Sequence, residues 1–139
     1  MAASGYLLDT NVISELRRRK PHGAVLAWIA AVPDAALHLA AVTLAEIQAG
    51  IEMTRRQDAE KAREIEAWLD QVEASYSVLP ADGRVFREWG RLMARRPDTA
   101  VEDALIAATA IVHGLTVVTR NTRHFRPLDV PLVDPFVAD

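Results

Sequence analysis

Three carboxylates stand where apolar segments end or helical segments begin. Asp9 directly follows the apolar stretch Tyr6–Leu8. Glu46 follows a second apolar stretch, and Asp103 opens a segment whose neighbours at i+3, i+4 and i+7 are apolar. A charged side chain beside apolar surface usually has a partner or a metal ion. Clustered carboxylates raise one another's pKa unless a cation neutralises them. An all-oxygen donor set suits Mg²⁺ or Mn²⁺, which can activate water for attack on a phosphodiester.

Each of these residues also has a purely structural interpretation, and a fourth polar position shares the ambiguity. Asn121 follows a β-branched segment and would suit an ordinary turn. Aspartate is a favoured helix N-cap, and a carboxylate in the first turn of a helix is stabilised by the helix dipole. Glu46 and Glu102 each lie three residues after a threonine, which is the spacing of a capping box. The sequence leaves these alternatives open.

The elements that must position these residues alternate between strands and helices. Short apolar or β-branched runs predict strands over residues 5–8, 36–40, 77–79, 115–119 and 132–133. Helical periodicity predicts helices over residues 11–19, 21–31, 43–54, 58–75, 82–95 and 101–113. This alternation argues for an α/β fold, a three-layer α/β/α sandwich with a mostly parallel central sheet. Ligands of such sheets bind beyond the carboxyl ends of the strands, so we expect the acids to converge there.

Composition narrows the function classes. The 139 residues suit one domain. The absence of cysteine excludes thiolate nucleophiles, disulfide frameworks and cysteine zinc sites. The net charge of −3 does not indicate whether the protein binds nucleic acid. No glycine-rich phosphate loop is present, which disfavours nucleotide binding. The longest charge-free run, residues 104–119, is too short for a membrane span, and the N-terminus lacks the basic region of a signal peptide. We therefore expect a cytoplasmic protein.

Four segments, in order along the chain, resemble the motifs of PIN-domain ribonucleases, in particular the FitB-like VapC toxins of type II bacterial toxin–antitoxin pairs. They begin with the stretch around Asp9-Thr-Asn11, followed by Thr43-Leu-Ala-Glu46, Glu102-Asp103-Ala-Leu-Ile and Leu115-Thr-Val-Val-Thr-Arg-Asn121. Each motif is weak alone, but four in family order are specific. The resemblance covers nearly the whole chain and implies a single PIN domain over residues 1–139.

The resemblance implies an Mg²⁺-dependent endoribonuclease that leaves a 3′-hydroxyl and a 5′-phosphate, with Mn²⁺ as a substitute ion. By position, Asp9 and Asp103 would hold the metal directly and Glu46 would support it. Asn121 would complete the catalytic set. Polar residues beside the motifs are candidate substrate contacts: Thr10, Asn11, Arg120, Arg123 and His124.

One position departs from the family pattern. Many relatives carry an acid three residues after the motif asparagine, where this chain has His124. This weakens the case for a second metal ion, and it could leave a one-metal site or make His124 a phosphate contact. The family further implies a homodimer and a cognate VapB-type antitoxin as partners.

Two other function classes compete with the nuclease interpretation. A receiver-like phospho-acceptor domain needs paired acids after its first strand and a late lysine, but no lysine follows Lys61. An Asp-x-Asp phosphatase is disfavoured because Asn11 fills the second position. A catalytically silent antitoxin-binding module, in which the acids serve only as helix caps, stays open. Metal binding and RNA cleavage separate this module from the enzyme.

Overall fold

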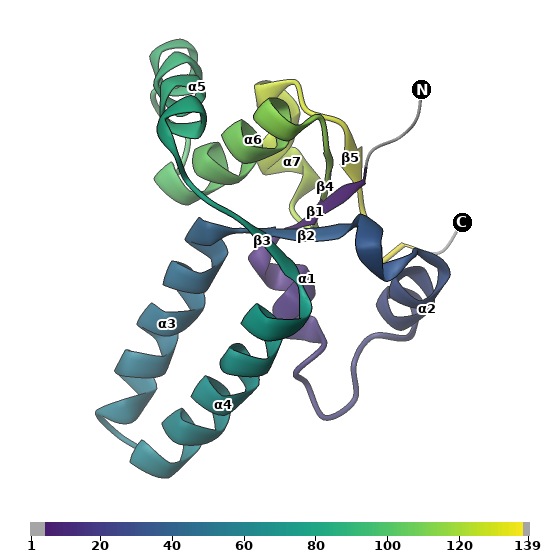
Figure 1. Ribbon diagram of the computed structural model, residues 1–139, viewed down its shortest axis with the longest axis vertical. Coiled ribbons are helices and arrows are strands. Elements are labelled where there is room, and N and C mark those ends of the chain that lie inside the picture. The colour runs from purple at the N-terminus through teal and green to yellow at the C-terminus, as the bar shows by residue number, and fades with distance from the viewer. Residues whose placement is uncertain (1–4, 138–139) are drawn as a thin grey trace.

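The computed structural model describes residues 5–137 and contains a five-stranded, all-parallel sheet (Figure 1). The strands are β1 (Tyr6–Leu8), β2 (Leu37–Ala40), β3 (Ser77–Leu79), β4 (Thr116–Val118) and β5 (Leu132–Val133). They lie in the order β3-β2-β1-β4-β5, so the chain starts in the middle of the sheet. The predicted strands and their parallel arrangement are confirmed.

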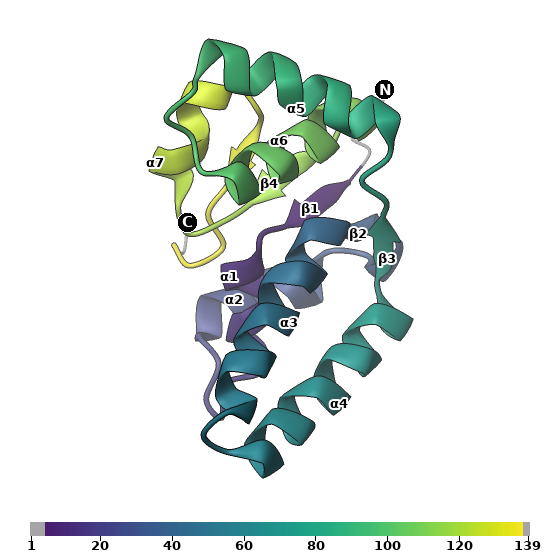
Figure 2. The ribbon, with the colours of Figure 1, turned by 90° about the vertical axis from the view of Figure 1, so that its left-hand side faces the viewer.

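Helices cover both faces of the sheet, which confirms the expected α/β/α sandwich (Figures 1 and 2). One face carries α1 (Thr10–Glu15), α2 (Gly23–Ala31), α3 (Ala41–Arg55) and α4 (Ala59–Ser75). The other face carries α5 (Gly83–Arg95), α6 (Val101–His113) and the short α7 (Thr122–Phe125). Helices α3 and α4 form a long antiparallel hairpin that projects from the sheet (Figure 2). None of the helices within residues 5–137 is long and apolar enough to pass through a bilayer.

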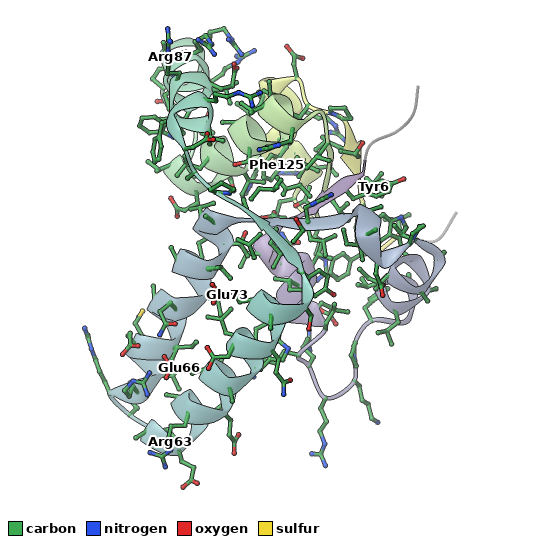
Figure 3. The ribbon with its side chains drawn as sticks, in the orientation of Figure 1. Tyr6, Arg63, Glu66, Glu73, Arg87 and Phe125 are labelled. Carbon is green, nitrogen blue, oxygen red and sulfur yellow. The ribbon has the colours of Figure 1, made fainter. Side chains whose placement is uncertain are left out.

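Neighbouring residues of each central strand point into different cores. Leu7 packs with α5, α6 and α7, whereas Leu8 packs with the helices of the opposite face. Val117 and Val118 of β4 divide in the same way. Both residues of each pair are fully buried, as expected for strands of a parallel sheet that is covered on both faces. Phe125 of α7 is a large buried side chain of the α5–α7 core (Figure 3).

Helix α3 begins earlier than its sequence pattern predicts, and neither of the two capping boxes that the sequence left open is formed. Strand β2 passes directly into α3 with Ala40 as the N-cap, so Thr43 lies inside the first turn rather than before it. Helix α6 is capped at Ala100 without a side-chain hydrogen bond, so Thr99 is not its cap. Neither Glu46 nor Glu102 therefore has the capping role that its spacing suggests.

Further boundaries differ at the N-terminal helices and after β4. Helix α1 ends at Glu15 rather than Arg19, because the chain turns back and His22 N–H donates to Glu15 Oε2 at 2.8 Å. Helix α2 begins at Gly23 with His22 as its cap, so Pro21 precedes the helix. The segment after β4, expected as a turn, forms the single-turn α7 and a 3₁₀ turn. By contrast, α6 ends as predicted at Gly114, whose φ of 66° favours glycine.

Candidate active site

Asp9 is a buried carboxylate at the carboxyl end of the central strand β1. Its backbone N–H donates to Val118 O at 2.9 Å, which fixes the residue between β1 and β4. Asp9 Oδ1 accepts from Thr10 N at 2.8 Å, so Asp9 caps α1 as its residue type suggests. Asp9 Oδ2 accepts from Thr119 Oγ1 at 2.7 Å and from Asn11 Nδ2 at 3.1 Å. Only 5% of Asp9 is exposed, so these contacts hold the carboxylate in one orientation.

Glu46 of α3 lies beside this position through a hydroxyl bridge. Thr10 Oγ1 donates to Glu46 Oε1 at 2.6 Å and lies 3.2 Å from Thr43 Oγ1. Thr43 is completely buried one turn before Glu46 on α3. The early start of α3 therefore turns Thr43 and Glu46 towards α1, and this contact joins the first motif to the second.

Asp103 lies in the first turn of α6, on the opposite helical layer from Glu46. Its helical neighbours Ile106, Ala107 and Ala110 are buried, as the sequence predicts. The Asp103 side chain is 23% exposed, and Asp103 Oδ2 lies 3.6 Å from Nδ1 of the more exposed His124. A carboxylate on the apolar side of a helix is thus placed at the surface where α6 meets α7.

The three carboxylates are coupled electrostatically. Burial raises the pKa of Asp9, although hydrogen bonds from Thr119, Thr10 and Asn11 oppose this effect. Burial also raises the pKa of Glu46, and the nearby charges of Asp9, Glu102 and Asp103 raise it further. The pKa of Asp103 is raised by burial and then by Asp9. Asp9 after β1 therefore lies close enough to Glu46 of α3 and Asp103 of α6 for its charge to act on both.

The donor chemistry of this cluster fits a hard divalent cation. Within residues 5–137, no group of three or more aspartate, glutamate or histidine side chains is arranged to hold a metal ion. Mg²⁺ does not need such a cage, because it keeps several waters and binds through one or two carboxylates plus substrate phosphates. A cation would favour the ionised form of these carboxylates, whose pKa values are raised by burial and, for Glu46 and Asp103, also by neighbouring carboxylates.

The remaining predicted residues surround the carboxylates unequally. Asn11 contacts Asp9 directly, and its Oδ1 accepts from Arg120 N at 3.2 Å. The Asn121 side chain is exposed, and only its backbone N–H contacts the site, through Thr119 Oγ1 at 2.9 Å. Arg120 and Arg123 are also exposed. With Asn121 and His124 they line a polar hollow of about 370 Å³ beside the carboxylates.

Thr119 is a site residue that the sequence did not single out. It is completely buried at the end of β4, where its hydroxyl donates to Asp9 and accepts from Asn121 N–H. Threonine is common at the end of a β-branched strand, so the residue type at this position does not indicate a functional role. Its role follows from the pairing of Leu8 with Val118, which aligns the ends of β1 and β4. Thr43 was used only as a candidate cap, and its packing against Thr10 was also missed.

The protein is thus an α/β/α sandwich with a parallel sheet, and its three carboxylates lie together, after β1, on α3 and on α6. Residues 6–130 match the family described as PIN domain. This match covers well over half of the chain, and the chain belongs to the PIN domain family.

Named relatives extend along almost the whole chain. The plasmid stability protein StbB of Pseudomonas syringae pv. tomato is 40% identical over 95% of this chain and 99% of its own. The VapC ribonuclease Y4jK of Sinorhizobium fredii is 36% identical over 94% and 96% of the two chains. The toxin FitB of Neisseria gonorrhoeae is 33% identical over 94% and 97%. The crystal structure of FitAcB from Neisseria gonorrhoeae superimposes with a TM-score of 0.84 at 32% identity, over 96% of this chain and 99% of that chain.

Proposed function

We propose that this chain is a metal-dependent endoribonuclease and the toxin of a toxin–antitoxin pair. The observation that carries the proposal is the coupling of Asp9, Glu46 and Asp103, three carboxylates from separate elements, in which the Asp9 charge raises the pKa of both Glu46 and Asp103. Membership of the PIN domain family supports it. So do relatives that are named a VapC ribonuclease and the toxin FitB.

Mg²⁺ is the proposed cofactor, with Mn²⁺ as a substitute. Asp9 and Asp103 would hold the ion and Glu46 would support it. When bound, such an ion lowers the pKa of water and offsets the charge on the scissile phosphate.

The surrounding side chains hold the acids ready for this role. Thr119 and Asn11 fix Asp9 Oδ2, while each carboxylate oxygen keeps further acceptor capacity. The Thr10 hydroxyl directs Glu46 Oε1, and Glu46 Oε2 has no hydrogen-bond partner among the described residues. Burial also excludes water from Asp9, which strengthens its interaction with a cation. These residues therefore position the charge before the substrate arrives, a feature that lowers the cost of reorganisation during reaction.

The substrate contacts proposed from the motifs lie next to the acids. Asn121, Arg120, Arg123 and His124 line the polar hollow after β4. Arginine binds phosphate oxygens in a bidentate manner, and asparagine can donate to them. Phosphates beside the scissile bond would therefore be held by this segment.

An antitoxin is the proposed protein partner, and a groove near α1 suits its attachment. This hollow of about 240 Å³ lies between α1 and the α3–α4 hairpin, with Ile47, Ile65 and Trp68 in its lining. Thr10 is part of its lining and also contacts Glu46, so a segment in the groove would come close to the acids. The family resemblance also favours a homodimer and one PIN domain over residues 1–139.

The deciding experiment compares RNA cleavage by the wild type, Asp103→Asn and Glu102→Gln, with Mg²⁺, with Mn²⁺ and with EDTA. Both substitutions remove one negative charge from the first turn of α6, but Glu102 is exposed. We expect cleavage that requires the ion, falls at least 100-fold in Asp103→Asn and stays within about threefold of wild type in Glu102→Gln. Chain ends carrying a 3′-hydroxyl and a 5′-phosphate would agree with the proposed hydrolysis.

The silent binding module predicts a different outcome. A folded wild type that neither binds Mn²⁺ nor cleaves structured RNA would contradict the nuclease proposal. The partner can be tested separately, because Ile65→Lys should disrupt the groove without touching the acids. The free variant should cleave RNA like the wild type and resist inhibition by the co-expressed antitoxin.

A further inference from the structure

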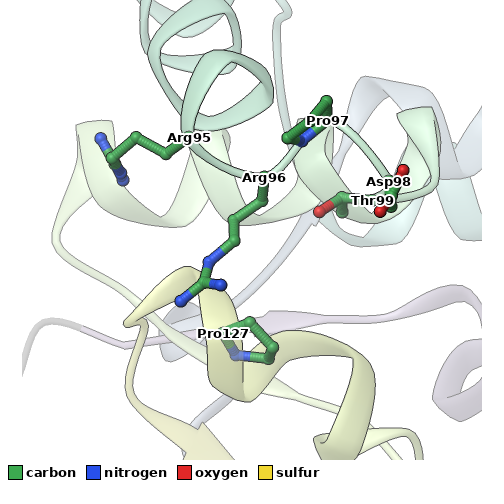
Figure 4. Close-up of a pocket in the computed structure, with 6 residues that line it drawn as sticks. All are labelled: Arg95, Arg96, Pro97, Asp98, Thr99 and Pro127. Carbon is green, nitrogen blue, oxygen red and sulfur yellow. The ribbon is translucent and has the colours of Figure 1, made fainter.

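Three hollows around α7 are linked by shared lining residues, and the middle one contains Asp103. The first, of about 430 Å³, lies between the end of α5 and the 3₁₀ turn after α7, and Figure 4 shows its lining. The second, of about 300 Å³, contains Asp103 and shares Asp98 and Thr99 with the first. The third, of about 370 Å³, shares His124 with the second. We call this surface the α5–α7 track.

Arginines gather at both ends of the track. They are Arg95 and Arg96 in the first hollow, and Arg120, Arg123 and Arg126 in the third. Within the part of the chain that the structure describes, none of these five lies within ion-pair distance of a carboxylate. Elsewhere, Arg18, Arg55, Arg63 and Arg91 each pair with a glutamate. Among the described residues, ten arginines have no ion-pair partner, and five of them lie along this one surface. The other five lie elsewhere on the protein and are Arg17, Arg19, Arg56, Arg84 and Arg87.

The arginines differ in how they are held. In Figure 4 the Arg96 side chain reaches across the first hollow towards Pro127, whereas Arg95 points away from it. The Arg120 guanidinium lies 4.2 Å from the centre of the Phe136 ring, a cation–π contact that limits its freedom. Arg96 is thus the cation at the α5 end that is best placed to bind a ligand in the first hollow. Arg126 lies on the same 3₁₀ turn as Pro127 and lines the third hollow.

We propose that the α5–α7 track holds the backbone of the RNA substrate on both sides of Asp103, with Arg96 and Arg126 each binding a phosphate. This inference rests on the proposed ribonuclease function and extends it to the path of the RNA backbone across the protein. Planar guanidinium groups match phosphate oxygens, and charges at both ends would offset the repulsion between RNA and the central carboxylates.

The track predicts that binding depends on each arginine separately. For single-stranded nucleic acid, each phosphate contact contributes about 0.7 to the slope of log affinity against log salt. Loss of one contact at about 0.1 M salt therefore weakens binding about fivefold. Contacts to phosphate carry little sequence information, so the loss should be similar for RNAs of different sequence.

The test measures binding of a labelled single-stranded RNA of about 20 nucleotides by fluorescence anisotropy in EDTA, across a range of salt concentrations. Arg96→Ala and Arg126→Ala should each bind about fivefold more weakly at about 0.1 M salt, with a shallower slope. Arg63→Ala is the matched control, because Arg63 pairs with Glu60 at the far end of the α3–α4 hairpin (Figure 3). It should bind within about twofold of wild type. Arg96→Lys should recover part of the loss, since the charge is kept.

Cleavage with Mg²⁺ distinguishes failure of this inference from failure of the proposed function. If the wild type cleaves RNA but both track variants bind and cleave like Arg63→Ala, the track is wrong and the nuclease stands. If the wild type does not cleave RNA at all, both are overturned. If the variants lose binding to the protein partner but not to RNA, the track is a protein interface and the inference fails. A rise in KM at nearly constant kcat in both track variants would support it.

Discussion

Asp103→Asn should stabilise the protein when no divalent cation is present. The substitution keeps the shape of the side chain and removes one of several mutually repelling charges. Two unit charges within about 10 Å of each other interact by about 1–2 kcal/mol at the effective dielectric of a protein surface. Against this gain stands the loss of a favourable helix-dipole interaction, about 0.3–1 kcal/mol. The contact with the largely exposed His124 contributes at most a few tenths of a kcal/mol. The balance is a gain of about 0.5 kcal/mol.

Urea unfolding followed by tryptophan fluorescence measures this gain directly. In EDTA at about pH 7.5, above the ordinary pKa of every carboxylate, Asp103→Asn should unfold at a higher urea concentration than wild type. Glu102→Gln removes a charge from the same helical turn and so loses the same dipole interaction, while it relieves a smaller part of the repulsion, because the Glu102 charge raises the pKa of Asp103 less than the Asp9 charge does. Saturating Mg²⁺ should reverse the order, because an ion at about 100 times its Kd stabilises the wild type by about 2.7 kcal/mol.

A lower stability of Asp103→Asn than of Glu102→Gln in EDTA would refute the reasoning. It would mean that the Asp103 carboxylate stabilises α6 by itself, as a purely structural residue would. The same conclusion would follow if Mg²⁺ left the stability of the wild type unchanged.

Three other substitutions test separate parts of the structure. Thr119→Val removes the hydroxyl that contacts Asp9 and should lower the free energy of unfolding by about 2 kcal/mol in urea, whereas Thr109→Val, which loses only a bond to a helix carbonyl, should cost under about 1 kcal/mol. Equal costs would show that the hydroxyl does not hold the carboxylate. Burial and a neighbouring histidine lower the pKa of His38, so the unfolded chain binds the proton more readily and stability should fall as pH drops below about 6.5. His38→Gln should remove that part of the slope in urea midpoints measured between about pH 7.5 and 5.5, and an unchanged slope would exclude His38 as its source. His124→Asp introduces the acid that the family resemblance leads us to expect beside Asp103 and should strengthen Mn²⁺ binding, with unchanged affinity in calorimetry counting against a metal role for this position.

The sheet and two of the acids were predictable because their signals are local. The stretch ending at Leu8 is fully apolar, as a strand covered on both faces requires, and Asp9 follows it directly. Asp103 lies on the apolar side of its own helix, so the spacing of its neighbours revealed an unusual charge without any tertiary information. Gly114 marked the end of the same helix for an equally local reason, the positive φ of the residue.

The start of α3 and the role of Thr119 were not predictable from the same kind of pattern. The spacing of Thr43 and Glu46 suits a capping box, but β2 continues into α3 without a linker, so the helix begins two residues earlier. That shift buries Thr43 and brings Glu46 to Thr10 on another helix. Thr119 depends in turn on the register between β1 and β4. Both features are set by contacts between segments that are far apart in the sequence.

The cap and site interpretations of Asp9 do not exclude each other, because they use different oxygens. Oδ1 accepts from Thr10 N–H, which is the whole requirement of an N-cap. A cap gains nothing from burial, and a serine would satisfy the same N–H without placing a charge in the protein. Oδ2, however, is held by Thr119 from one strand and Asn11 from α1. Two further donors on a carboxylate whose pKa is still raised by burial are more than a helix start requires. The polar contacts around Asp9 therefore favour a role in binding a cation over a role as a helix cap alone.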